Sequence, residues 1–163
     1  MVGLFWIDGA GCWLGAAPGE EAEGIRLTDE GPEVVGASGT ALSWAQIQQV
    51  TVPNAPARSA FRRGLSTAIG LAAAMTGFGD FETPPLMTVC LTHDGGVSEH
   101  HVPTAASPAY TEREVALSHA LLDRFVAGEA SPSLLTEWWR SAGGCAALKP
   151  AEREALLEGW CGR

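Results

Sequence analysis

The sequence has a single lysine, Lys149, and no broad basic region. Its formal net charge is −9 at pH 7, and acidic residues lie on both sides of a short segment that contains three arginines. Residues 1–57 carry seven acids and one arginine, and residues 80–163 carry twelve acids and six bases. A chain of this charge repels phosphate at long range. We therefore expect no nucleic-acid partner, while a local anion site at the three arginines stays open.

Closely spaced metal-ligand pairs are also missing. The cysteines form no CxxC pair and no zinc-finger-type pairing with histidine; they are Cys12, Cys90, Cys145 and Cys161. Because the number of cysteines is even, two disulfides are possible. However, the apolar N-terminus lacks a basic segment and is interrupted by Asp8, so it does not resemble a secretory signal. We expect reduced thiols in a cytoplasmic protein.

The hairpin sequence "HDGGVSEHH" contains residue types that bind metals, but its spacing disfavours a metal site. His100 and His101 are neighbours in a predicted strand, and neighbouring strand residues point to opposite faces. They could not both ligate one ion without distortion. The sequence predicts an ordinary polar hairpin and no metal site.

Recognisable catalytic motifs are absent as well. The sequence has no G-x-S-x-G, no P-loop and no G-x-G-x-x-G after a strand. Cys12 follows a hairpin turn, which has no helix dipole to lower a thiol pKa. His119, Asp123 and Cys90 could converge only through the fold. We predict no catalytic residue and no cofactor, and we keep a small-ligand binder or an enzyme with an unrecognised site as a third alternative.

What the sequence does contain is a series of short strand patterns. "GLFWI" and "CWLG" surround the turn sequence "DGAG", and "LMTVCLT" and "VSEHHV" surround "HDGG". "GIRLT" alternates apolar and polar residues, as a half-buried strand does. "EVVG" is the next strand. "TALSW" places Thr40, Leu42 and Trp44 on one face, and "IQQVTV" continues the β pattern up to Pro53.

Helical patterns follow the strands. In "YTEREVALSHALLDRFVAG", Thr111 and Glu114 have the spacing of a capping box. "SPSLLTEWWR" and "KPAEREALLEGW" each have proline at the expected first helical position, with Ser131 capping the former. We predict a mainly β fold with α-helices, namely a barrel or sandwich of about seven antiparallel strands closed by a helix. This β-domain would span 1–128, and a small helical extension would span 129–163.

The stretch "LTDEGPEVVGASGTALSWAQIQQVTV" resembles the bacterial pleckstrin-homology-like (PH-like) domains. The resemblance rests on a strand at Ile25–Thr28, a return strand at Val34–Val35, and a third strand at Leu42–Trp44 that ends in the tryptophan, with Ile47 three residues on. It covers about residues 12–128. In this pattern a single helical turn after the tryptophan redirects the chain, and the isoleucine restarts the core-facing alternation. The resemblance implies a scaffold that binds peptides, protein surfaces or phosphorylated headgroups. Fold alone does not establish function.

An insertion at 54–85 departs from that pattern. It contains "ARSAFRRG", with Arg58, Phe61, Arg62 and Arg63, and then runs from 64 to 79 without a charge. Sixteen helical residues reach about 24 Å, which is short of the roughly 30 Å hydrocarbon core of a bilayer, so we expect no membrane span. Three arginines near an anionic surface contribute only about 3 kcal/mol. Core cover, protein interface and membrane contact all stay open.

The sequence "EWWR" is the densest aromatic cluster in the chain. Neighbouring helical residues diverge by about 100°, so we expect one tryptophan to pack on the β-domain and the other to contact the last helix or a partner. Our leading hypothesis is a non-catalytic protein-interaction or scaffold module that binds a protein partner or itself. The alternative is peripheral binding to anionic membranes or headgroups through residues 57–80. The candidate interaction residues are Arg58, Phe61, Arg62, Arg63, Trp138 and Trp139.

Overall fold

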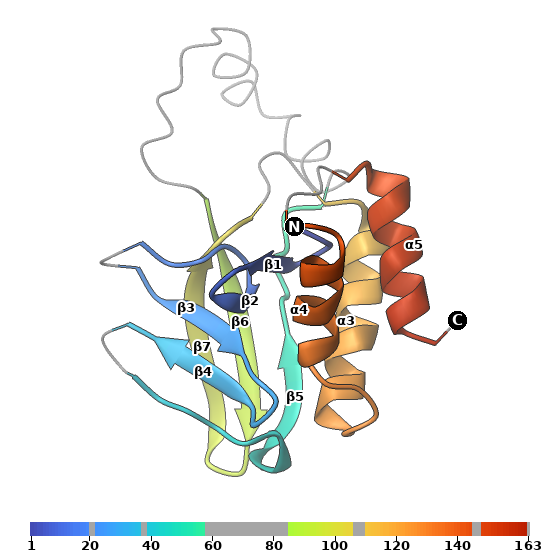
Figure 1. Ribbon diagram of the computed structural model, residues 1–163. Helices are drawn as coiled ribbons and strands as arrows, with labels where there is room; N and C mark the ends of the chain where they lie inside the picture. The colour runs from blue at the N-terminus through green and yellow to red at the C-terminus, as the bar shows by residue number, and fades with distance from the viewer. Residues whose placement is uncertain (20–21, 37–38, 58–84, 106–109, 145–147, 163) are drawn as a thin grey trace, which may run out of the picture.

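A computed structural model describes residues 1–19, 22–36, 39–57, 85–105, 110–144 and 148–162 (Figure 1). Within these ranges, seven antiparallel strands form two sheets, and three helices follow them in the chain. The predicted mainly β fold with α-helices is therefore confirmed. The strands of the described ranges form two open sheets rather than a closed barrel.

The first sheet is a four-stranded meander in which each strand pairs with the next. Apolar and polar residues alternate along it, so that Ile25 and Leu27 are buried while Arg26 between them is half-buried. Both predicted turns of this sheet, after "FWID" and before "PEVV", join neighbouring strands. The strands are β1 (Phe5–Asp8), β2 (Gly11–Leu14), β3 (Gly24–Leu27) and β4 (Pro32–Val35).

The second sheet has the order β5–β6–β7. Its two long strands form the hairpin predicted at "HDGG", and Met87, Val89 and Leu91 are fully buried on one face. The two sheets meet where the backbone N–H of Ala16, after β2, donates to the carbonyl of Pro103 at 2.7 Å. The strands are β5 (Ile47–Thr51), β6 (Leu86–His93) and β7 (Gly96–Pro103).

The prediction of a strand over "TALSW" is wrong. Only one isolated bridge forms there, between Glu33 and Ala41, and the chain then enters a 3₁₀ turn, η1 (Trp44–Gln46). Ser43 and Gln46 form a capping box that starts this turn. The turn places the Trp44 indole where it donates to the carbonyl of Thr28 at 2.9 Å. The expected redirection of the chain is confirmed, because the following Ile47 is buried and begins β5.

Helix α3 (Glu112–Val126) covers β5 and η1 and completes the core. Thr111 and Glu114 form the predicted capping box. Phe125, at the end of the helix, packs between the rings of Phe5 and Trp44, with centroids 6.4 and 5.8 Å away. One apolar cluster therefore joins residues from β1, η1 and α3.

Two shorter helices, α4 (Ser133–Ser141) and α5 (Pro150–Trp160), complete the fold. Helix α5 packs on α3, whereas α4 packs against β1 and β2 (Figure 1). Each contains one fully buried leucine, Leu135 in α4 and Leu157 in α5. Pro150 occupies the first turn of α5 as predicted, while Pro132 lies one residue before α4 rather than at its first position.

Candidate binding groove along helix α4

Helix α4 is held at its start by a residue from the first sheet. The N–H of Ser133 donates to the carboxylate of Asp29, in the β3–β4 turn, at 3.1 Å, and the hydroxyl of Ser131 donates to the same oxygen. Ser131, the expected N-cap, lies one residue before the actual N-cap Pro132, and its hydroxyl accepts the Ser133 N–H at 3.3 Å. A carboxylate at this position satisfies helix N–H groups and interacts favourably with the helix dipole. The cap therefore fixes α4 beside the turns of the first sheet.

The two tryptophans of α4 take the separate directions expected from helical geometry. Trp138 packs edge-on against Trp160 of α5, with ring centroids 5.7 Å apart. Trp139 lies against the β1–β2 turn and the glycine that follows α4, and a side chain added at Gly9 or Gly144 would meet its ring. Both indoles are half-buried. Trp139 therefore keeps part of its apolar surface open beside the turn.

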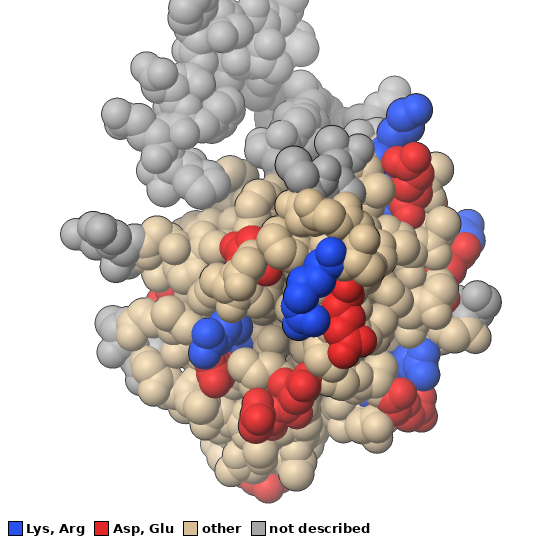
Figure 2. Space-filling view, viewed as in Figure 1, with Lys and Arg blue, Asp and Glu red and all other residues tan. Residues whose placement is uncertain are grey.

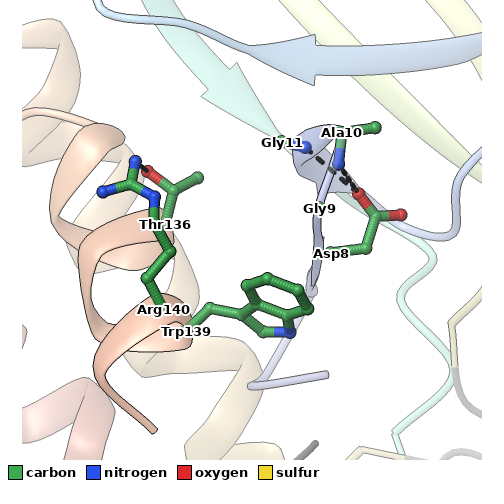
Figure 3. Close-up of a pocket in the computed structure, with 7 residues that line it drawn as sticks. All are labelled: Asp8, Gly9, Ala10, Gly11, Thr136, Trp139 and Arg140. Carbon is green, nitrogen blue, oxygen red and sulfur yellow. Dashed lines mark hydrogen bonds between the residues drawn. The ribbon is translucent and has the colours of Figure 1, made fainter. Parts of the chain in front are cut away.

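Between α4 and the turns of the first sheet lies a groove made of two adjoining cavities. The first has a volume of about 370 Å³ and the second about 290 Å³. The cavities share four lining residues and so form one continuous feature; these are Ala10, Gly11, Thr136 and Arg140. Figure 3 shows Trp139 of α4 directed toward the turn from Asp8 to Gly11 across the first cavity, while Arg140 runs along α4 toward Thr136.

The second cavity extends the groove toward the start of α4. Its further lining comes from β3, the β3–β4 turn and the residues that begin the helix, including Arg26, Asp29, Glu30 and Pro132. The groove thus follows α4 from Arg140 back to Pro132. Eight helical steps of about 1.5 Å correspond to about 12 Å, which equals three to four residues of an extended chain at about 3.3 Å each.

The acidic residues along this groove are mostly engaged within the protein. One carboxylate oxygen of Asp8 accepts the N–H groups of Ala10 and Gly11 at 2.8 and 3.1 Å, and the other accepts the Trp6 indole at 3.0 Å. Figure 3 shows this carboxylate on the side of the turn away from Arg140. Asp29 caps α4, as described above. Such hydrogen bonds hold a carboxylate in place and reduce its availability to a ligand.

Arg140, unlike these acids, is largely available to a ligand. It is exposed, and its Nη2 donates to the hydroxyl of Thr136 at 3.3 Å. Four of the six basic side chains in the described ranges form ion pairs with acids, and Arg140 and Lys149 do not. Glu137, one turn earlier on the exposed side of α4, forms no ion pair with it. In the face shown in Figure 2, basic side chains are scattered among acidic ones.

The remaining sequence candidates separate into two groups. Arg58, Phe61, Arg62 and Arg63 lie outside the described residues, as does the whole of 58–84. His100 and His101 have different partners. The Nδ1 of His100 lies 3.5 Å from the Oε2 of Glu23, whereas the Nδ1 of His101 contacts the hydroxyl of Thr88. Among the described residues, no group of three or more histidines, cysteines or acids is arranged to hold a metal ion.

Cys12 and His119 are both held by the fold. The Cys12 thiol is buried, and burial together with Asp8 raises its pKa far above the ordinary value. His119 accepts the backbone N–H of Val52 at its Nε2, at 3.1 Å, and burial lowers its pKa despite the nearby Asp123. His119 therefore joins α3 to the end of β5 as a neutral hydrogen-bond acceptor.

Sequence reasoning missed the groove itself. It identified Trp139 but not Thr136, Arg140 or the backbone of the β1–β2 turn, which it interpreted only as a hairpin. The available signal was an arginine directly after two tryptophans in a chain with few bases. The partners that make this a groove lie more than 100 residues earlier in the chain.

Comparisons with family models, with curated proteins and with solved structures found no match. Of the helices that the structure describes, none combines the length and apolar character needed to cross a bilayer. Function therefore has to be inferred from the groove and its chemistry.

Proposed function

We propose that this chain is a non-catalytic protein-interaction module of PH-like fold. Its groove along α4 binds an extended segment of a partner protein. The arrangement of four and three antiparallel strands followed by a closing helix supports the PH-like assignment. Trp44 begins a single 3₁₀ turn, and the buried Ile47 follows that turn, which supports the assignment further.

The observation that carries the binding proposal is the continuous groove with Trp139 on its wall. Tryptophan and arginine are enriched among residues that dominate binding energy, and here they are neighbours on one side of the groove. The opposite wall is the backbone of Gly9, Ala10 and Gly11, where the lack of large side chains lets another backbone approach closely. A groove about three to four extended residues long suits a peptide segment.

The test is selection of binders from a random ten-residue peptide library displayed on phage, with the full chain immobilised. We expect an enriched sequence family, and we expect its synthetic representatives to lose at least about tenfold in affinity to Trp139→Ala, as for a contact at the centre of an interface. Ala10→Trp, at an exposed position that lines both cavities, would block the groove without removing a packing contact. Val97→Ala, an exposed apolar residue of β7, is the matched control.

Two results would overturn this proposal. One is a library that yields no enriched family. The other is an enriched family that binds Ala10→Trp as tightly as the wild type, since binding would then occur elsewhere. A concentration-dependent dimer that Ala10→Trp dissociates would assign the groove to a second copy of this chain instead of a separate partner.

A further inference from the structure

We propose that the groove selects a segment with one carboxylate side chain, which pairs with Arg140, and disfavours segments with several neighbouring acids. This inference rests on the proposed function and names the chemistry of the partner. The inference follows from which charged side chains of the groove are already paired within the protein and which are not.

Arg140 occupies the part of the groove that both cavities share. A guanidinium has five N–H donors in a planar fork, and the hydrogen bond to Thr136 uses one of them. That hydrogen bond also orients the side chain along α4, as Figure 3 shows. The remaining donors suit a carboxylate, which a guanidinium can bind through two parallel hydrogen bonds.

The other charges of the groove do not compete for that role. Asp8 is turned to its own loop, and Asp29 is bound at the start of α4. Arg26, at the second cavity, is paired with Glu33 through an Nε–Oε2 distance of 2.8 Å. The structure thus leaves a positive charge at the centre of the groove that forms no ion pair with any acid of the described residues.

The preference for a single acidic residue in the ligand follows from the negative charges near the groove. Glu30, an exposed acid, lines the second cavity, where a second ligand carboxylate would meet like charge. The chain as a whole carries −9, which repels a run of acids at long range. A neighbouring ligand residue on the other side of Arg140 would instead contact the open face of Trp139, which favours an apolar or aromatic side chain.

The experiment uses immobilised pentapeptide mixtures with a fixed central residue and randomised flanking positions. Mixtures centred on Glu, Gln and Lys, and one with three central Glu residues, are compared for retention of the labelled full chain. For the wild type we expect the single-Glu mixture to be retained about tenfold better than the Gln mixture, as for a charge-assisted hydrogen bond. The triple-Glu mixture should be retained less than the single-Glu mixture.

Variants then locate the preference. Arg140→Gln should remove the preference for Glu over Gln, and Arg140→Glu should reverse it toward Lys. Lys149 is the other base of the described residues that forms no ion pair. Lys149→Gln therefore removes the same charge outside the groove and should leave the preference unchanged. Arg140 is exposed, so its variants are expected to fold, and circular dichroism checks this.

The outcomes distinguish this inference from the proposed function. Retention of all mixtures alike, lost in Ala10→Trp, would overturn the carboxylate preference while leaving a peptide-binding groove. A Glu preference that Arg140→Gln retains, or that Lys149→Gln loses, would overturn the assignment to Arg140. No retention of any mixture would overturn both.

Discussion

Helices α4 and α5 have similar lengths and one buried leucine each, yet they use their charged residues in different ways. In α5, the charged side chains on the side of α3 are engaged by α3: Arg153 pairs with Glu114, Glu154 accepts from Thr111, and Glu158 pairs with Arg113. In α4, Arg140 donates to Thr136 of its own helix and pairs with no described acid, and Trp139 lies beside an open cavity.

The difference indicates separate roles for two helices of similar size. A helix whose polar side chains are satisfied by the fold contributes to stability and has little left to offer a ligand. Helix α4 is held by Leu135, by Trp138 packed on Trp160, and by an external cap, so Trp139 and Arg140 stay available for binding. Stability and binding should therefore respond to different residues, and the following substitutions test this.

The largest expected effect is at the ion pair between α3 and α5. The Glu114 side chain is fully buried and that of Arg153 is 12% exposed. Glu114→Gln keeps an acceptor for the Thr111 N–H but leaves a buried arginine without its counter-ion. We expect the free energy of unfolding, measured by urea denaturation, to fall by about 3 to 5 kcal/mol.

Two controls sharpen that result. Glu158→Gln removes a partner of the exposed Arg113 and should cost far less than Glu114→Gln. The double variant Glu114→Leu with Arg153→Met replaces both charges with apolar groups and should recover much of the loss. If Glu114→Gln is as stable as the wild type, α5 is not held by this pair.

The next effect concerns the cap of α4. Asp29→Ala removes the carboxylate that accepts the Ser133 N–H, and we expect a loss of about 1 kcal/mol, as for other helix N-caps. Glu30→Ala, at an exposed position of the same turn, removes the same charge without touching the cap and should change stability little. Equal losses from both variants would show that net charge, rather than capping, is responsible.

How far these features follow from the sequence depends on how local they are. The hairpin turns at "DGAG" and "HDGG" and the Thr111–Glu114 capping box depend on residues a few positions apart, and the structure confirms them. The expected strand over 40–44 failed for a local reason too, since the capping box of Ser43 and Gln46 starts a 3₁₀ turn and overrides the alternating pattern.

The groove was beyond sequence reasoning because its contacts are distant. Asp29 caps a helix that begins 104 residues later, and the β1–β2 turn meets Trp139 only after both sheets and α3 have formed. Composition and periodicity report which residues are apolar or charged. They do not report that Asp8 is engaged by its own turn while Arg140 forms no ion pair with an acid in the described ranges.

A smaller effect concerns the pH dependence of stability at His119 in α3, the helix on which α5 packs. His119 of α3 accepts the Val52 N–H, and burial lowers its pKa below the ordinary value of 6.5. The unfolded chain therefore binds a proton at a higher pH than the folded chain does. This contribution to stability is present above about pH 6.5 and is lost as the pH falls toward the lowered pKa of the folded state.

The measurement is urea denaturation between pH 5 and pH 8, with His119→Gln beside the wild type. Glutamine can accept the same N–H without titrating, so the variant should show a smaller loss of stability on acidification. His101→Gln, an exposed histidine of β7, should follow the wild-type curve. Identical pH profiles for wild type and His119→Gln would remove His119 as the cause.

The smallest expected change in stability is at Arg140, and it completes the comparison between the two helices. The same substitution, arginine to glutamine, should be costly in α5 at Arg153, because it leaves the buried Glu114 carboxylate unpaired. In α4, Arg140→Gln loses one exposed hydrogen bond to Thr136, and we expect a change within about 0.5 kcal/mol in urea denaturation. Peptide retention should show the reverse order, with Arg140→Gln losing the carboxylate preference. A stability loss at Arg140 as large as that at Arg153 would mean that α4, like α5, uses its charge to hold the fold.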